Sequence, residues 1–167
     1  MNKHLFFALI ILAFGLGINR ASAQEQQAYK VGLVGFYNLE NLFDTIDDPN
    51  KNDEEFLPKG GNQWNTEKYI SKLHNMAYAI STIGTDITPD GVAVLGLCEM
   101  ENRHVLEDLV AQPEIKSRNY QIVHYDSPDR RGGDVGLIYN PKYFKLTNSK
   151  SYRTIVPDDP ELITRDQ

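Results

Sequence analysis

The sequence predicts an α/β fold in which helices lie on a mixed β-sheet. Three observations support this fold class. Val92–Cys98 is a continuous apolar run, which is typical of a strand buried on both faces. Residues 70–83 carry apolar side chains at three- and four-residue steps, the spacing of a helix with one buried face. From Tyr120 onward, short apolar and aromatic runs predict further strands, so the order of elements is β-α-β-α-β-β-β.

The first predicted elements are a strand, a long loop and a helix. Tyr29–Leu39 is rich in Val, Leu, Phe and Gly and has no charge after its second residue, which suits a buried strand. Residues 41–65 form a polar loop, and loops of this length are often functional. The helix is expected to start at Asn65 or Thr66 and to stop at Gly84. Its apolar positions are Ile70, Leu73, Ala77, Ile80 and Ile83.

The second half of the chain predicts one more helix and several strands. A turn at residues 89–91 leads into Val92–Cys98. A helix is expected from Arg103 to Ala111, with Asn102 as its cap. The remaining predicted strands cover residues 120–125, 135–139 and, with breaks, 144–156. Nothing in the sequence indicates a repeat, a second domain or an oligomeric state.

The first 23 residues predict a secretory signal peptide that is cleaved after Ala23. A basic start at Lys3 precedes an uncharged apolar run from Leu5 to Ile18, and Ala21–Ala23 has the small-x-small pattern of a cleavage site. A membrane anchor is the alternative, but the run is shorter than the roughly 20 apolar residues that a spanning helix needs. We therefore expect a secreted or periplasmic product without a stable membrane anchor, in which residues 24–167 belong to a single domain.

The charge of the chain limits its function. Removal of residues 1–23 takes away Lys3 and Arg20, so the net charge moves from −6 to −8. Acidic residues gather between Asp44 and Glu55. This distribution argues against a protein that coats DNA non-specifically, although not against a nuclease whose metal supplies positive charge. The single cysteine, Cys98, excludes an internal disulfide and is predicted to be a small buried hydrophobic residue.

Two predicted buried strands each end in polar residues. The first gives Asn38-Leu39-Glu40 and the second gives Glu99. If the strands are neighbours, these oxygen atoms meet at the end of the sheet where ligands of α/β proteins usually bind. Carboxylates with an amide carbonyl suit Mg²⁺, Mn²⁺ or Ca²⁺ rather than zinc. The alternative is structural, with Glu99 marking where the strand reaches solvent and Asn38 capping a turn.

Residues 126–134 also allow two interpretations. The simpler one is a glycine-containing hairpin turn with exposed arginines. The other places the Arg131 guanidinium and the Asp134 carboxylate at the mouth of a phosphate-binding site, because arginine binds phosphate through two hydrogen bonds. Two further metal sites are rejected. Residues 48–59 lack the glycine and the final glutamate of an EF-hand loop, and no Cys/His cluster could hold zinc.

Three segments in order resemble motifs of the endonuclease/exonuclease/phosphatase superfamily. They are Phe36–Asp44, Gly96–Asn102 and Arg131–Tyr139. Each motif alone is weakly specific, but their common order and spacing extend over essentially the whole chain after Ala23. The resemblance implies a four-layer α/β sandwich with mixed sheets, a phosphoester substrate such as nucleic acid or a small phosphorylated molecule, and a divalent metal, usually Mg²⁺.

The resemblance also implies roles for individual residues. Asn38 matches the asparagine that ends the first strand and orients the phosphate or its attacking water, and Glu99 matches the acidic metal ligand. Glu40 falls where some members have a metal-binding aspartate. Arg165 lies near an arginine that contacts phosphate in some members. Cys98 stands where the family often has glutamine, which changes one hydrogen-bonding partner beside the metal site.

One departure from the family pattern is large. The second half of the family supplies an Asp-x-Asn segment and a water-activating aspartate–histidine pair, and neither has a match before Gln167. His74, His104 and His124 are predicted to be structural or exposed. We therefore expect the N-terminal part of an exported, metal-dependent phosphoester hydrolase that is inactive by itself. The alternative is an exported binding module that keeps the fold without the chemistry. The reading frame beyond Gln167 would distinguish the two.

Overall fold

The computed structural model describes residues 29–159 of the 167-residue chain. The predicted signal peptide and Arg165 lie outside the described residues. Residues from Val31 onward form one compact unit, and every helix and strand below belongs to it. None of the helices within the described range is long and apolar enough to cross a bilayer.

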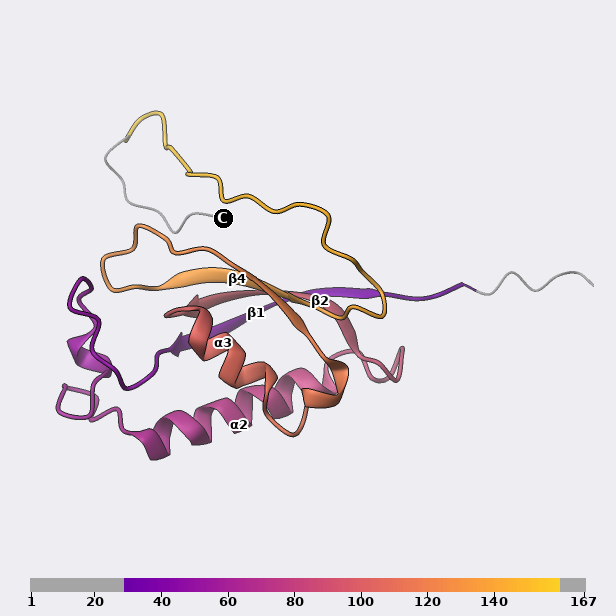
Figure 1. The fold of residues 1–167 in the computed structure, drawn as a ribbon, viewed down its shortest axis with the longest axis horizontal. Coiled ribbons are helices and arrows are strands. Elements are labelled where there is room, and N and C mark those ends of the chain that lie inside the picture. The colour runs from indigo at the N-terminus through magenta and orange to yellow at the C-terminus, as the bar shows by residue number, and fades with distance from the viewer. Residues whose placement is uncertain (1–28, 160–167) are drawn as a thin grey trace, which may run out of the picture. The chain divides into compact units, whose positions relative to one another are not determined.

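The unit is built on a mixed four-stranded sheet in the order β1-β2-β4-β3 (Figure 1). β1 (Leu33–Leu42) runs parallel to β2 (Val92–Met100), and β4 (Asp134–Tyr139) runs antiparallel to both β2 and β3 (Gln121–His124). The carboxyl ends of β1, β2 and β3 and the start of β4 therefore lie together, at what we call the carboxyl end of the sheet. Among the described residues β1 has a strand neighbour on one side only.

Two α-helices pack on one face of this sheet. α2 spans Thr66–Thr82 and α3 spans Arg103–Val110, and Figure 1 shows both on the same side. Each begins at an asparagine whose side chain accepts a hydrogen bond from the first turn, at 3.0 Å for Asn65 and 3.1 Å for Asn102. Two short 3-10 helices, η1 (residues 54–56) and η2 (residues 116–118), lie in the connections. The predicted α/β class with a mixed sheet is confirmed.

The hydrophobic core lies between the sheet and the two helices. Its fully buried members include Leu39, Leu42, Ala77, Ile80, Leu95, Leu97, Met100, Leu106, Leu109 and Ile138. The predicted apolar stripe of α2 is wrong at one position, because Ile70 is 55% exposed while the neighbouring Tyr69 is 8% exposed. The buried stripe runs from Tyr69 through Leu73 and Ala77 to Ile80, which leaves Ile70 about 100° around the helix from it.

Two other expectations differ from the structure. β1 continues past Leu39 to Leu42, so the polar residues Asn38 and Glu40 lie inside the strand rather than after it. Residues 144–155 do not form a strand. They run along the sheet on the side opposite the helices (Figure 1), and Phe144 and Tyr152 are exposed there. The apolar pattern alone does not make a strand, because strand-forming residues need a neighbouring strand to pair with.

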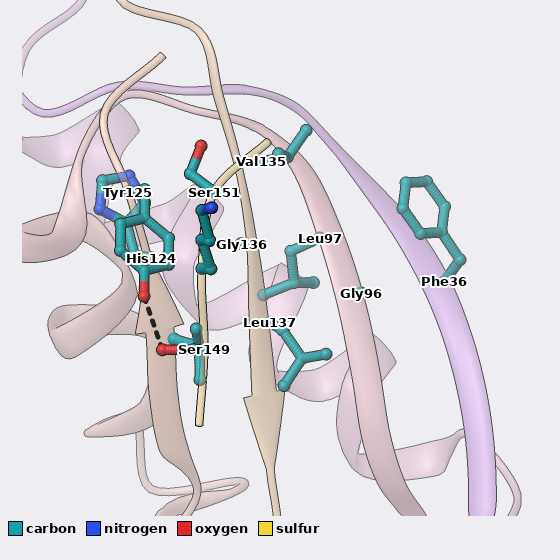
Figure 2. Close-up of a pocket in the computed structure, with 12 residues that line it drawn as sticks. Phe36, Gly96, Leu97, His124, Tyr125, Val135, Gly136, Leu137, Ser149 and Ser151 are labelled. Atoms are coloured by element: carbon teal, nitrogen blue, oxygen red, sulfur yellow. Dashed lines mark hydrogen bonds between the residues drawn. The ribbon is translucent and has the colours of Figure 1, made fainter. Parts of the chain in front are cut away.

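The sheet face opposite the helices is only partly covered. Val34 and Phe36 point to this face and are 74% and 69% exposed. Cys98 pairs in register with Asn38 on the same face and is half-buried rather than buried as predicted. A cavity of about 350 Å³ lies between this face and residues 149–151 (Figure 2). One hydrogen bond of 2.6 Å, between the hydroxyl groups of Tyr125 and Ser149, joins its two walls.

The acidic loop after β1 is anchored by carboxylates that the fold buries. Asp53 is 1% exposed, and Asp44 and Glu101 are each 8% exposed. Oε2 of Glu101 accepts a 2.7 Å hydrogen bond from the backbone N–H of Asp44, and Oδ2 of Asp53 accepts one of 3.1 Å from the N–H of Asp48. Burial raises the pKa of Glu101 to about 7; the Asp44 N–H acts against this rise, while the charges of Asp44, Asp53 and Asp48 add to it.

The burial pattern of α2 predicts unequal costs for two isoleucines. Ile80→Ala removes a fully buried side chain and should lower the free energy of unfolding by roughly 2–5 kcal/mol, because it leaves a cavity. Ile70→Ala, at an exposed position of the same helix, should change it by less than about 0.5 kcal/mol. Chemical denaturation of both variants measures the difference. Equal losses would show that the assigned buried face of α2 is wrong.

The pKa of Glu101 predicts a pH-dependent stability. The folded protein holds this proton more tightly than the unfolded chain, where the ordinary value is 4.5. The stabilisation is therefore complete below pH 4.5 and is lost as the pH rises through about 7. Glu101→Gln should remove this part of the pH dependence, worth roughly 2–4 kcal/mol. Glu55→Gln, an exposed acid of the loop that Glu101 anchors, is the control, and identical pH curves for the wild type and Glu101→Gln would contradict the expectation.

Candidate functional site

The structure brings Asn38, Glu40 and Glu99 together at the carboxyl end of the sheet. Asn38 of β1 pairs in register with Cys98 of the parallel strand β2, so Glu99 follows directly at the end of the neighbouring strand. Both Glu40 and Glu99 interact electrostatically with the ammonium group of Lys72. Both carboxylates therefore lie near the ammonium group of Lys72, and Asn38 precedes Glu40 by two residues on β1.

Both strands change direction where these acids occur. Five non-glycine residues in the described range have a positive φ, and three of them lie here: Glu40 at 50°, Asn41 at 60° and Glu99 at 59°. The ladder between β1 and β2 shifts register between Asn38 and Leu42, and the ladder between β2 and β4 shifts between Cys98 and Met100. Each strand therefore carries a β-bulge, a feature that turns side chains in a new direction and is frequent next to active sites.

The bulges keep the acids out of the core. Side chains of a regular strand alternate between faces, so residues three apart point to opposite sides. Yet Leu39 and Leu42 are both fully buried, and so are Leu97 and Met100. The extra residues of the two bulges return the apolar side chains to the core and leave Glu40 exposed and Glu99 half-buried. A left-handed conformation costs a non-glycine residue about 1–3 kcal/mol, and the surrounding packing must offset this.

Asn38 has a defined structural partner. Its Oδ1 accepts a hydrogen bond of 2.6 Å from the backbone N–H of Glu40, so the side chain closes the turn that starts the bulge. The alternative prediction, in which Asn38 caps a turn, is therefore correct for its side-chain oxygen. Within residues 29–159 no hydrogen bond engages its amide nitrogen, and the side chain is exposed. This nitrogen can donate to a ligand while the oxygen holds the turn.

Lys72 of α2 was not identified from sequence. Its half-buried side chain reaches the end of β1, where Nζ donates to the carbonyl oxygens of Glu40 and Asn41 and lies 5.5 Å from the centre of the Trp64 ring. Burial lowers the pKa of the ammonium group, and the carboxylates of Glu40 and Glu99 act in the opposite direction. The sequence offers one weak signal, since Lys72 adjoins Leu73 at the border of the buried stripe of α2.

The hairpin between β3 and β4 turns Asp134 inward. Asp134 is 1% exposed; its Oδ2 lies 2.8 Å from Nε2 of His124, and its Oδ1 accepts a 2.9 Å hydrogen bond from the N–H of Ser127. Arg131, in contrast, is exposed on the hairpin loop, where its backbone N–H donates to Oδ1 of Asp129 at 2.8 Å. The structure thus contains the hairpin with exposed arginines, placed at the carboxyl end of the sheet.

A second group of donor atoms lies at the same end of the sheet. His124, Asp126 and Asp134 each offer one atom, and the three atoms lie within 4.8 Å of one another, close enough to share a metal ion. No other group of three His, Cys, Asp or Glu residues in the described part of the chain meets this condition. The His124 side chain is 4% exposed, as expected for a structural histidine. The sequence position of His124 within a strand did not indicate that Asp134, across the hairpin loop, would be its partner.

A sequence model of the Endonuclease/Exonuclease/phosphatase family matches residues 33–167. No curated protein and no solved structure matches. The match begins with β1, includes every strand of the sheet and contains Asn38, Glu40, Glu99 and Arg131. Because it covers most of the chain, this protein belongs to the endonuclease/exonuclease/phosphatase family.

Proposed function

We propose that this protein is an exported, Mg²⁺-dependent hydrolase of phosphoesters whose active centre contains Asn38 and Glu99. The family domain indicates a hydrolase of the phosphoester type, and members of the family are usually metal-dependent. The observation that carries the finer proposal is the meeting of Asn38, Glu40 and Glu99 at the ends of two parallel strands. For export, the support is the signal-peptide pattern of residues 1–23.

The residues at this end of the sheet fit a hard divalent cation. Glu99 and Glu40 offer carboxylate oxygens, which Mg²⁺ prefers, and Mg²⁺ usually takes only one or two protein carboxylates and completes its shell with water and phosphate. Mn²⁺ and Ca²⁺ accept the same donors. When bound, such a cation would polarise a phosphoryl oxygen and offset the charge that develops in the transition state.

The protein side chains orient the substrate. With its oxygen held by the N–H of Glu40, Asn38 can use its amide nitrogen to donate a hydrogen bond to a phosphoryl oxygen or to hold the attacking water. Exposed Arg131 can bind phosphate from the hairpin loop at the same end of the sheet. Asp134 has both oxygens engaged by His124 and Ser127, so we assign it to supporting this loop rather than to phosphate binding.

The proposed substrate is a nucleic acid or a small phosphorylated molecule. The acidic loop from Asp44 to Glu55 begins next to β1 and makes a long polyanion the less favoured of the two. Burial of Asp44 and Asp53 reduces this effect, because part of the acidity is not on the surface. Asp47, Glu54 and Glu55 remain exposed, so a small phosphoester still fits the electrostatics of this end of the sheet better than a long polyanion.

Replacement of the proposed metal ligand tests the function. In the full-length protein, Glu99→Gln should lower kcat/KM for an activated phosphodiester by roughly 100-fold or more, because metal stabilisation of the transition state is worth several kcal/mol. EDTA should abolish wild-type activity and added Mg²⁺ should restore it. Glu107→Gln at an exposed position of α3 makes the same chemical change on an element that supplies none of the proposed site residues, and it should have no effect.

The contrary outcomes are equally specific. Wild-type activity in Glu99→Gln that also resists EDTA would remove Glu99 and the metal from the mechanism. A folded full-length protein without activity on any phosphoester, with or without Mg²⁺, would favour the binding module that keeps the family fold.

Two substitutions of Asn38 separate its structural and chemical roles. Asn38→Asp keeps an oxygen for the N–H of Glu40 but loses the amide donor, so it should fold like the wild type and lower kcat by roughly 10–100-fold. Asn38→Ala loses both groups and should also lower the free energy of unfolding by about 0.5–1.5 kcal/mol. Steady-state kinetics and chemical denaturation measure the two effects. If Asn38→Asp kept full kcat, Asn38 would have only the structural role.

A further inference from the structure

Lys72 connects three parts of the chain that are distant in sequence. It starts on α2, passes the ring of Trp64 and ends at the bulge of β1. There its Nζ donates one hydrogen bond to the carbonyl oxygen of Glu40 and another, of 3.3 Å, to that of Asn41. Hydrogen bonds from a charged donor are roughly twice as strong as those between neutral groups, so these contacts hold the backbone firmly.

The two carbonyl groups belong to the left-handed residues of the bulge. A bulge interrupts the ladder, so its backbone groups need other partners if they are to stay out of water. Three contacts fix this segment: the Asn38 side chain holds the N–H of Glu40, the N–H of Phe43 reaches the carbonyl of Asn41 at 3.1 Å, and Lys72 binds both carbonyls. Only the last comes from another secondary-structure element, because Asn38 and Phe43 lie within or next to β1.

Lys72 and Lys68, the two lysines of α2, bind different parts of the chain. Lys68, one turn earlier, is exposed, and its Nζ donates to the carbonyl oxygen of Asn62 in the loop before the helix. Lys72 is half-buried and interacts with the carboxylates of Glu40 and Glu99. The ammonium group of Lys72 thus holds the bulge of β1, whereas that of Lys68 holds the loop before the helix.

We propose that Lys72 is a positioning residue of the active centre, which holds the left-handed segment Glu40–Asn41 and thereby the directions of Asn38 and Glu40. Its positive charge also offsets the repulsion between the carboxylates of Glu40 and Glu99 when no cation is bound. Two of its donors are engaged by the backbone, so it acts through these residues rather than by contact with the reacting atoms. The proposal rests on the function proposed above.

The test compares Lys72→Met, Lys72→Arg and Lys68→Met in the full-length protein. Lys72→Met keeps the apolar stem beside Trp64 but removes the donors and the charge. We expect its kcat on an activated phosphodiester to fall by about 10–100-fold with little change in KM, because a misplaced group slows the chemical step. Its affinity for Mn²⁺, followed through the free-ion EPR signal, should fall several-fold. Lys72→Arg should recover most of both quantities, and Lys68→Met should match the wild type.

Three results would overturn the role of Lys72. One is a Lys72→Met variant with a lowered melting temperature but unchanged kcat and Mn²⁺ affinity, which would make the lysine purely structural. Another is tighter Mn²⁺ binding at unchanged kcat, which would leave only charge repulsion between Lys72 and the metal. The third is a Lys72→Arg variant that recovers nothing, which would mean that charge and donors are not what the site needs.

The same data separate this proposal from the function on which it rests. If the wild type binds Mn²⁺ but hydrolyses no phosphoester, the proposed function fails, and the effect of Lys72→Met on Mn²⁺ affinity still decides the role of Lys72. If the wild type hydrolyses phosphoesters and Lys72→Met equals it in both kcat and Mn²⁺ affinity, only the positioning role is lost.

Discussion

The candidate site depends on two β-bulges at the carboxyl ends of the parallel strands β1 and β2. Each bulge lets an apolar residue re-enter the core while the acid beside it stays outside. The left-handed conformations of Glu40, Asn41 and Glu99 cost about 1–3 kcal/mol each. Burial of a side chain such as Leu42 or Met100 contributes about 1.5–3 kcal/mol in the opposite direction. Core packing thus maintains a backbone that the acids alone would not adopt.

Local signals in the sequence predict the elements of the fold well. Asn65 and Asn102 mark the helix starts because each side chain bonds the first turn of its own helix, an interaction within four residues. The strand at Val92–Cys98 is recognisable because every residue in it is apolar or small. Periodicity placed Ile70 on the wrong side of α2, since two adjacent residues, Tyr69 and Ile70, both fit an apolar stripe and only the packing against the sheet chooses between them.

The sequence predicted the part of the candidate site that depends on strand ends. It did not predict the part that depends on contacts between segments far apart in the chain. Asn38 and Glu99 could be paired from the motifs, because parallel neighbouring strands bring their ends together. Lys72 could not be identified, since its partners are carbonyl groups that become available only at a bulge. The same reason hides the burial of Asp53 and Glu101. A carboxylate in a polar segment is predicted to be exposed until the backbone N–H groups that donate hydrogen bonds to it are known.

The position of β1 in the sheet has a consequence for how the protein behaves in solution. This strand carries Asn38 and Glu40, and within residues 29–159 it is also an outer strand whose free side displays backbone groups beside the exposed side chains of Val34 and Phe36. Outer strands of this kind readily accept a strand from another molecule. An added strand would hydrogen-bond to the very backbone that sets the direction of the Asn38 amide. Pairing with a second molecule and the geometry of the candidate site would therefore be coupled through a single strand.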